Sequence, residues 1–321
     1  MGGIVALTLD FELAWAYRLH PDKYAARRRF IEGAPEAVRQ LLGLLVETHT
    51  SACWAVLGAM CAGERGPPGL PEMAIETANR LCPVPVGSDE RRLWFAPEAV
   101  RQIADCRQPQ ELGCHSFAHE DFASVNEDVA KESVRLSVAV VRCFGGPPRS
   151  WVFPRNRPGH LPLLKAHGLT CYRGTNSEWY WRLRPAALAF AARMADDWFA
   201  HRPPVLQACL HDGLWEVPHS MFFAGTLGAR GLVSLSRQVA RAKKGIEAAR
   251  RGGVFHLWTH PHNLGWHTRS VLQALGEVLD AASRCRQAGD VQCLSMGEVA
   301  SRAAIGTFGG PEETPWAPGQ G

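Results

Sequence analysis

Short apolar segments alternate with amphipathic segments along most of this chain. Each apolar segment is bounded by polar residues or glycine, which is typical of a buried strand, whereas the amphipathic segments repeat their apolar positions with helical spacing. Strands are predicted at 4–9, 52–58, in the segment leading into His115, at 149–154, 169–174, 215–218, 254–260 and 291–296. Helices are predicted at 35–46, 97–106, about 126–144, 162–168, about 232–251 and 268–287.

This alternation of strand and helix predicts a parallel sheet. Seven or eight such units favour closure into a (β/α) barrel over an open sheet. We therefore expect an α/β fold in which one barrel occupies residues 1–305, because no repeat or linker divides this part of the chain. Residues 306–321 are rich in Pro and Gly, and they are expected to form a flexible C-terminal tail.

Composition restricts the class of protein and its compartment. At 321 residues, 46% hydrophobic and 21% charged, the chain is large enough for one barrel-sized domain or two smaller ones. Ten cysteines without any C-x-x-C pair argue against a zinc ribbon or a redox dithiol. Neither a secretory signal nor an apolar stretch of membrane-spanning length is visible. We therefore expect a reduced, cytoplasmic protein without a transmembrane segment.

Residues that carry chemistry collect where predicted strands end. In a (β/α) barrel, the side chains that follow the carboxyl ends of the strands share one rim, and barrel enzymes place catalysis there. Four strand ends supply carboxylates, imidazoles and a guanidinium: Asp10 and Glu12, His115 and His119, Arg155 and Asn156, and His260, His262 and Asn263. Polar residues without a shared role would be scattered over both ends of the barrel.

The carboxylates and histidines of this rim predict a metal site. A D-x-E pair presents two carboxylates, of which one can ligate a divalent metal while the other takes a proton from the attacking water. His115 and His119 are four residues apart, so a helical turn would place both rings on the same side. Two His and one carboxylate, with positions left open for water, form a hydrolytic zinc arrangement that also suits other first-row metals. Glu12 is available as that carboxylate.

Four short motifs, in this order, resemble the polysaccharide deacetylase (NodB-like carbohydrate esterase) family. They are T-L-D-F-E near the N-terminus, H-S-F-A-H, V-F-P-R-N and L-W-T-H-P-H-N, and the H-S-x-x-H element is the most specific of them. The likeness covers roughly residues 4–300. It implies a distorted (β/α) barrel, here with seven or eight parallel strands, that removes N- or O-acetyl groups from sugars with a single divalent metal.

The resemblance also implies the roles of individual residues. Asp10 is similar to the general base of the family, Arg155 to the arginine that orients this base, and His260 to the histidine that acts as general acid. The metal ligands would be Glu12, His115 and His119. One divalent ion is expected, zinc in the first place, with cobalt, nickel, manganese and iron as alternatives.

The chain departs from the family pattern at three places. The common pair of adjacent aspartates is replaced by Asp10-x-Glu12, whose glutamate reaches one methylene further. The arginine motif usually continues with Pro-Tyr-Gly, whereas here Asn156 follows and Arg157 is an alternative match. The expected aspartate–tryptophan element has no clear counterpart, and the nearest sequences are Asp197-Trp198 and Trp215.

For several other polar and aromatic residues, the sequence allows more than one role. His262 is an alternative to His260 as the acid, and Glu120 and Asp121 are candidates for surrogate ligands or for partners that fix an imidazole tautomer. The tryptophans at 179, 181, 198 and 215 either stack on sugar rings or belong to the core. The basic run 240–253 is a solvated helix face or attracts a phosphate-bearing substrate, including a lipid-linked sugar at a membrane surface.

The sequence therefore predicts a metal-dependent hydrolase that removes an N-acetyl group from an amino sugar, on a sugar nucleotide, a lipid-linked sugar or a glycan intermediate. A deformylase or other amidohydrolase acting on a non-acetyl amide is the alternative within hydrolases. A non-catalytic glycan-binding barrel is the alternative outside them, although binding needs no paired base and acid. No nucleic-acid-binding module is recognisable, and the sequence does not determine the oligomeric state.

Overall fold

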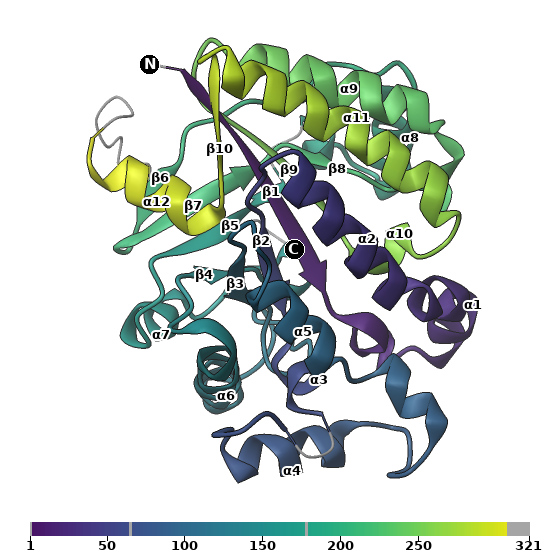
Figure 1. Ribbon diagram of the computed structural model, residues 1–321, viewed down its shortest axis with the longest axis vertical. Coiled ribbons are helices and arrows are strands. Elements are labelled where there is room, and N and C mark those ends of the chain that lie inside the picture. Colours follow the sequence, from purple (N-terminus) through teal and green to yellow (C-terminus); the bar gives the residue numbers. More distant parts are fainter. Residues whose placement is uncertain (1, 64–65, 177–178, 307–321) are drawn as a thin grey trace.

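The computed structural model describes residues 2–63, 66–176 and 179–306 (Figure 1). Within this part of the chain, one ten-stranded sheet runs in the order β6-β7-β5-β4-β3-β2-β1-β9-β8, and β10 also pairs with β1. The pairings are parallel except that of β6 with β7. The strands are β1 (Gly3–Phe11), β2 (Cys53–Val56), β3 (Glu111–Cys114), β4 (Ser150–Trp151), β5 (Cys171–Asn176), β6 (Cys209–His211), β7 (Leu214–His219), β8 (Met221–Phe222), β9 (Val254–Thr259) and β10 (Val291–Leu294).

Strand β1 is the centre of this sheet. Its residues 4–9 pair with β9, residues 8–11 with β2 and residues 3–6 with β10. Because a strand has two hydrogen-bonding edges, β2 and β10 follow each other along one edge while β9 occupies the other. All nine residues of β1 are buried, as expected for a parallel strand covered on both faces. The carboxyl end of β1 therefore emerges between β2 and β9.

The inner side of the curled sheet changes from apolar to charged along β1. Alternate residues of a strand face the same side, and Ile4 and Ala6 belong to an inner apolar cluster. Thr8 and Asp10 continue this alternation toward the carboxyl end and are also buried. Helix α12 packs against β1, β5 and β7 and adds Met296 to the inner cluster, so it closes the amino-terminal end of the curl. The charged end is left for the site.

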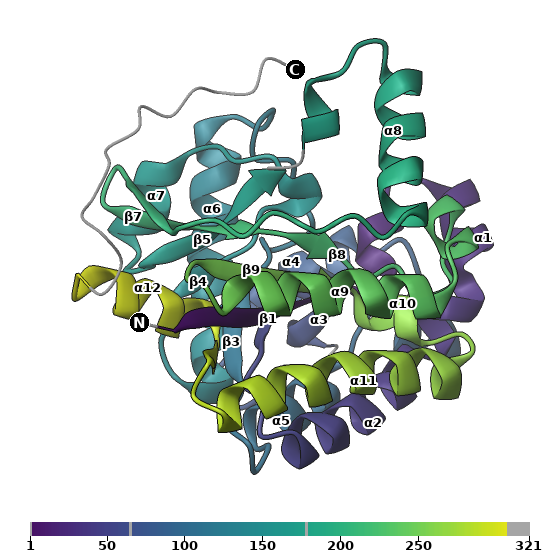
Figure 2. The ribbon, with the colours of Figure 1, turned by 90° about the horizontal axis from the view of Figure 1, so that it is seen from above.

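Helices cover the outer side of the sheet in sequence. Each of α9, α11, α2, α5, α6 and α7 packs against the next, and Figure 2 shows α2, α5 and α11 together on one side of β1. The helices are α1 (Pro21–Glu32), α2 (Ala34–Glu47), α3 (Gly58–Ala62), α4 (Glu72–Leu81), α5 (Pro97–Ala104), α6 (Glu127–Gly145), α7 (Leu161–Ala166), α8 (Ala186–Trp198), α9 (Leu235–Ala249), α10 (Pro261–Leu264), α11 (Thr268–Gln287) and α12 (Met296–Ala304).

The predicted fold class is confirmed: the protein is α/β with a curled, mostly parallel sheet that forms a distorted, incompletely closed barrel. All eight predicted strands are present, as β1 to β5, β7, β9 and β10. Two additional strands, β6 and β8, form the edges of the sheet. They are three and two residues long, too short to produce a recognisable apolar pattern.

Helix α1 was not predicted because its sequence lacks a clear apolar stripe. Helix α1 buries a single side chain, that of Ile31, and is otherwise basic and polar. Helix α12 begins within the predicted strand 291–296, where Ser295 and Glu298 form a capping box that ends the strand and starts the helix. Of the expected tail 306–321, all but Gly306 lies outside the described residues.

Expectations about membrane-spanning segments and about the cysteines also follow from the sequence. No helix among the described residues is both long and apolar enough to cross a membrane. All ten cysteines lie in the described part of the chain, and none of them forms a disulfide there.

Candidate metal centre

A cavity of about 700 Å³ opens at the carboxyl ends of the strands. Side chains from the ends of β1, β5, β7 and β9 and from the loops after β3 and β4 line it. The rim predicted from the sequence is therefore one continuous site. Its floor is the inner side of the sheet, where the apolar cluster ends.

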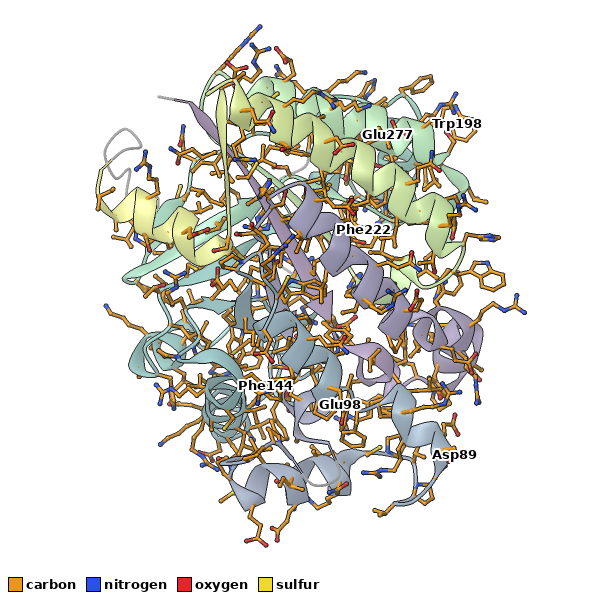
Figure 3. The ribbon with its side chains drawn as sticks, in the orientation of Figure 1. Asp89, Glu98, Phe144, Trp198, Phe222 and Glu277 are labelled. Carbon is orange, nitrogen blue, oxygen red and sulfur yellow. The ribbon has the colours of Figure 1, made fainter. Side chains whose placement is uncertain are left out.

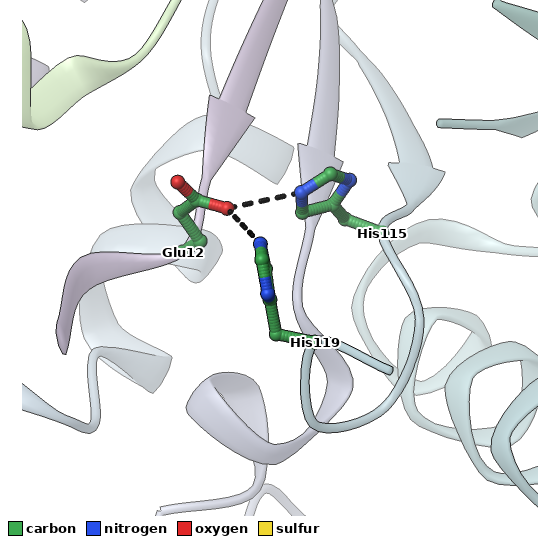
Figure 4. Close-up of side chains that lie close together, drawn as sticks. All are labelled: Glu12, His115 and His119. Atoms are coloured by element: carbon green, nitrogen blue, oxygen red, sulfur yellow. Dashed lines mark hydrogen bonds and ion pairs between the residues drawn. The ribbon is translucent and has the colours of Figure 1, made fainter. Parts of the chain in front are cut away.

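Glu12, His115 and His119 converge in this cavity (Figure 4). The Oε2 atom of Glu12 lies 3.0 Å from Nε2 of His115 and 3.2 Å from Nε2 of His119. Glu12 and His115 are buried, and His119 is partly exposed toward the cavity. The sequence predicted these three side chains as metal ligands, and the structure brings one ligand atom of each within 4.8 Å of the others.

The segment that carries the two histidines is a loop, and the helical turn expected from their spacing is absent. Ser116 and His119 adopt positive φ angles of 64° and 63°, which are incompatible with a right-handed turn. The loop is held by Glu120, whose carboxylate accepts hydrogen bonds from the backbone N–H of Ala118 and from Oγ of Ser133 at 2.9 Å. Glu120 therefore shapes the loop rather than fixing an imidazole tautomer.

The tautomer of His115 is fixed by the backbone. Its Nδ1–H donates a hydrogen bond to the carbonyl oxygen of Val152 at 2.9 Å. A neutral ring then has its lone pair on Nε2, the atom that faces the Glu12 carboxylate. Two acceptors at 3.0 Å repel each other unless a proton or a metal cation lies between them. Burial lowers the pKa of His115, but the hydrogen bond to Glu12 and the nearby carboxylates outweigh it and raise this pKa above its ordinary value.

The histidines around Glu12 keep its carboxyl group ionised. Burial raises the pKa of this carboxyl, but His260, His115 and His119 outweigh that effect and hold the pKa well below its ordinary value. Glu12 is therefore an anion that faces imidazole nitrogens on several sides, as a carboxylate ligand of a shared cation does.

Asp10 is bound by Arg173, a residue of β5 that the sequence reasoning missed. Nη1 and Nη2 of Arg173 donate hydrogen bonds to the two carboxylate oxygens at 2.6 and 2.7 Å, and both side chains are buried. Nη2 also donates to Oδ1 of Asn156 at 2.8 Å, and the guanidinium lies 4.3 Å from the ring centroid of Trp258. Burial raises the pKa of Asp10, but Arg173 and His115 outweigh it, so this pKa lies below its ordinary value.

Arg155 does not contact Asp10, contrary to the role implied by the family resemblance. Its backbone is left-handed, with φ 60°, and its side chain is about half exposed at the mouth of the cavity. There it donates to Nε2 of His20 at 3.3 Å. The alternative, Arg157, pairs with Asp121 at 2.6 Å and also does not reach Asp10. The left-handed turn leaves Asn156 directed at Arg173 and both flanking arginines outside.

His260 faces the two carboxylates, and His262 lies behind it. Nε2 of His260 is 3.4 Å from Oε1 of Glu12 and 3.8 Å from Oδ2 of Asp10. His262 is buried, stacks on His260 with ring centroids 4.9 Å apart and lies 3.2 Å from the hydroxyl of Tyr17 through Nε2. Burial, followed by the nearby His260, lowers the pKa of His262 to about 3. Burial also lowers the pKa of His260, and Glu12 and Asp10 oppose this effect.

Two further histidines lie under the site. His219 ends β7, lines the cavity and makes a hydrogen bond through Nδ1 to the carbonyl of Gly174 at 3.0 Å. His256 on β9 is fully buried and makes hydrogen bonds with the Thr8 hydroxyl and the Pro218 carbonyl. Burial, followed by the charge of Arg173, lowers the pKa of His219 to about 4 and that of His256 to about 3. Both rings are therefore neutral near neutral pH.

Of the tryptophans singled out from the sequence, the three whose side chains the structure describes do not line the cavity. Trp198 ends α8 on the periphery and is half exposed (Figure 3), while Asp197 is paired with Arg230 and Arg241. Trp179 is exposed, Trp215 packs on the inner apolar cluster, and the side chain of Trp181 lies outside the described part. The cavity is instead lined by Trp258 and Phe222. The aspartate–tryptophan element thus has no counterpart among these candidates.

A sequence signal for the missed residues did exist. Arg173 is the fifth residue of the predicted strand 169–174 and the third residue of β5, while His219 follows the predicted strand 215–218 and ends β7. In the segment L-T-C-Y-R-G, a charged residue in an otherwise apolar strand needs a buried partner. The strand-end rule, applied to all eight predicted strands, would have included both residues.

Comparison with known proteins supports the fold. No protein-family model and no curated protein matches the sequence. A solved structure described as a polysaccharide deacetylase from Mycobacterium smegmatis is 19% identical, with a TM-score of 0.62 over 99% of this chain and 96% of that one. One described as a polysaccharide deacetylase from Pseudomonas aeruginosa PAO1 is 13% identical, with a TM-score of 0.60 over 98% and 92%. Puue allantoinase is 12% identical, with a TM-score of 0.60 over 95% and 91%. The protein thus has the fold of these hydrolases.

Proposed function

We propose that this protein is a metal-dependent hydrolase of the polysaccharide deacetylase family, which removes an N-acetyl group from an amino sugar. The observation that carries this proposal is the pair formed by His115 and Glu12. The backbone fixes the His115 tautomer so that the Nε2 lone pair is directed at the Glu12 carboxylate. A divalent cation bound by both groups removes their repulsion.

The three side chains fit such a cation by an independent criterion. Two ligands bound tetrahedrally to zinc at roughly 2.0–2.1 Å lie about 3.3 Å apart. The Glu12 oxygen lies 3.0 and 3.2 Å from the two imidazole nitrogens, close to this separation. Glu12, His115 and His119 would therefore hold the metal and leave coordination positions facing the cavity. When bound, the metal supplies Lewis acidity, which polarises the acyl carbonyl and makes water easier to deprotonate.

Asp10 is the proposed general base, and Arg173 is its positioning residue. A base must be ionised and held within reach of the water whose proton it takes. The bidentate contact with Arg173 does both, because it orients the carboxylate and lowers its pKa. Arg173 therefore takes the role that the family resemblance implied for Arg155.

His260 is the proposed general acid. It lines the cavity, and its Nε2 faces the space around the two carboxylates where the scissile amide would lie. A proton held on this nitrogen is placed for transfer to the leaving amine, which is a poor leaving group unless it is protonated. His262 lies behind His260 and does not line the cavity. We therefore keep His260 as the acid.

An amino sugar is the proposed substrate because the cavity combines polar groups with aromatic surfaces. Tyr17, Phe222 and Trp258 line it, and rings of this kind pack against the apolar faces of sugars. The similarity to an allantoinase supports a second candidate function, in which the same residues hydrolyse a non-acetyl amide. A cytoplasmic setting is part of the proposal, and it is supported by ten cysteines that form no disulfide.

Acetate release distinguishes these alternatives. The protein, loaded with zinc, is incubated with N-acetylated amino sugars, their N-formyl analogues and allantoin, and the released acid or the new amine is quantified. We expect turnover of the N-acetyl sugars at the highest kcat/KM. Preference for the formyl sugars or for allantoin would select the second candidate. Binding of the sugars without any hydrolysis would select a glycan-binding barrel.

A further inference from the structure

The cavity lining carries an excess of positive charge. Five cationic side chains and two carboxylates line it: Lys23, Arg155, Arg173, Arg193 and Arg230, against Asp10 and Glu12. Asp10 is paired with Arg173, and Glu12 belongs to the metal group. The four remaining cations lie on α1, on α8 and on the short 3-10 helices Pro154–Asn156 and Ala229–Leu232. They approach the cavity from four separate segments.

We propose that the substrate bears a phosphate group beside its acylated sugar, and that these cations bind the phosphate. This inference rests on the hydrolase function proposed above and names the class of its substrate. An arginine fork matches phosphate oxygens, and a lysine supplies a point charge to the same group. A volume of about 700 Å³ accommodates a sugar together with such a group.

Arg155 is the best placed of these cations. The nearest carboxylate is that of Asp121, whose Oδ2 is 2.6 Å from Arg157 but 3.8 Å from Nη1 of Arg155. Asp121 is therefore bound to Arg157, and the Arg155 guanidinium extends along the cavity mouth to His20. Its side chain is 47% exposed, so its remaining N–H donors can reach a ligand at low cost in desolvation.

Arg230 contributes a fixed donor rather than net charge. Asp197 accepts two hydrogen bonds from it, at 2.7 and 3.0 Å, and its guanidinium lies 5.1 Å from the ring centroid of Phe222. Arg241 binds Asp197 as well as Asp196, so two arginines and two aspartates balance each other. The excess charge on which the site depends therefore comes from Lys23 and Arg155.

The basic run 240–253, for which the sequence left open a solvated helix face or the attraction of phosphate, does not supply this charge. Arg241 is buried in the cluster with Asp196 and Asp197, Lys243 pairs with Glu277 at 3.3 Å, and Arg250 pairs with Glu247. No described residue of this run lines the cavity. The proposed phosphate-binding residues are therefore those of the cavity wall and not those of helix α9.

The test compares neutral and phosphorylated substrates of the zinc-loaded protein. The substrates are N-acetylglucosamine, its 1-phosphate, the uridine diphosphate sugar and a polyprenyl-phosphate-linked sugar in vesicles. We expect kcat/KM to rise by at least about 10-fold for each strong charge-assisted contact to the phosphate, and this advantage to shrink with added salt. A preference for the nucleotide or for the lipid identifies the phosphate carrier. Equal kcat/KM for neutral and phosphorylated sugars would overturn the proposal.

Variants of the cavity wall provide the second arm. Arg155→Gln and Lys23→Gln should each lower the ratio of phosphorylated to neutral kcat/KM by about tenfold. Arg157→Gln is the matched control, because its side chain is 49% exposed and bound to Asp121 outside the cavity lining. It should leave the ratio unchanged, as should Lys243→Gln on α9. Equal effects of Arg155→Gln and Arg157→Gln would contradict a specific phosphate site.

A binding measurement separates this inference from the hydrolase proposal. Inorganic pyrophosphate is titrated into the wild-type protein and the same variants by calorimetry. We expect binding that Arg155→Gln weakens about tenfold and Arg157→Gln does not. If no substrate is hydrolysed, the hydrolase proposal fails, while this pattern of pyrophosphate binding still supports the phosphate site. Hydrolysis of neutral sugars without pyrophosphate binding would leave the hydrolase and remove the phosphate site.

Discussion

Arg173 and Asp10 form a buried, bidentate ion pair, with hydrogen bonds of 2.6 and 2.7 Å between strands β5 and β1. These strands are separated in the sheet by β4, β3 and β2, so the pair spans the inside of the curl. The contact joins the proposed base to the opposite side of the sheet. It also brings in Asn156 and Trp258, which contact the same guanidinium.

Replacing Arg173 should therefore affect both stability and catalysis. Arg173→Gln leaves the Asp10 carboxylate buried without its cation, which should cost about 3–5 kcal/mol in the free energy of unfolding. Arg173→Lys keeps the charge but loses the fork, so the protein should fold, bind metal normally and lose about 10–10²-fold in kcat with little change in KM. Denaturant unfolding, metal analysis and steady-state kinetics measure these effects. Arg157→Lys is the control, and a loss of kcat equal to that of Arg173→Lys would contradict the positioning role.

Asp10 and Glu12 should separate in their effects on metal and on turnover. Asp10→Asn should keep bound metal near the wild-type level and lower kcat by about 10²–10⁴-fold, because a positioned base is removed. Glu12→Gln should weaken metal affinity instead, because it removes the charge of the ligand that both histidines share. Equilibrium dialysis with zinc and rates at saturating zinc distinguish the two. The reverse pattern would exchange the roles assigned to these carboxylates.

His260 should matter more for amides than for activated esters. An amine needs a proton to leave, whereas the phenolate of an aryl acetate leaves without one. His260→Ala should therefore lower amide hydrolysis by about 10²–10⁴-fold and spare aryl acetate hydrolysis. Asp10→Asn should impair both, because the water is deprotonated in either reaction. An equal loss on both substrates in His260→Ala would remove this histidine from the acid role, and His262→Ala would then be measured in the same way.

The buried neutral histidines predict a steep loss of stability in acid. His256 has a folded pKa of about 3, below the ordinary value of 6.5, so the folded state resists a proton that the unfolded state accepts. Its contribution to stability is complete above pH 6.5 and falls by about 1.4 kcal/mol per pH unit between 6.5 and about 3. In metal-free protein, His256→Gln should reduce the slope of unfolding free energy against pH by this amount between pH 6 and 4. An unchanged slope would show that His256 does not bind this proton on unfolding.

The sequence predicted the position of a residue correctly where that residue directly follows or ends a predicted strand. The apolar alternation located eight strands, and the strand-end rule brought Asp10, Glu12, His115 and His260 to one cavity. It failed where the loop backbone decides direction. Nothing in the local pattern of V-F-P-R-N requires the left-handed turn that leaves Arg155 outside. The buried charge of Arg173 is visible in the sequence, but its pairing with Asp10 depends on how β5 and β1 face each other across the sheet, which periodicity along the chain does not contain.

The same limit applies to the loop that carries the histidines. The spacing of His115 and His119 predicted a helical turn, yet two positive φ angles and the contacts of Glu120 produce the convergence. The ligand set and the conformation of its backbone are therefore separate problems. Side-chain chemistry predicted the first. The second depends on Ser133 of the following helix α6, whose hydroxyl accepts a hydrogen bond from the backbone N–H of Phe117 and donates one to Glu120.

Metal titration of chelator-treated protein tests the central claim most directly. Zinc is added in steps, and bound metal and acetate release from an N-acetylated amino sugar are measured on the same samples. We expect one high-affinity zinc per chain and acetate release that rises in proportion to it. In the variant with Glu12→Gln, His115→Ala and His119→Ala combined, both signals should be lost while circular dichroism shows a folded protein. Acetate release that persists after chelation, or zinc bound as tightly by the triple variant, would contradict the proposed metal centre.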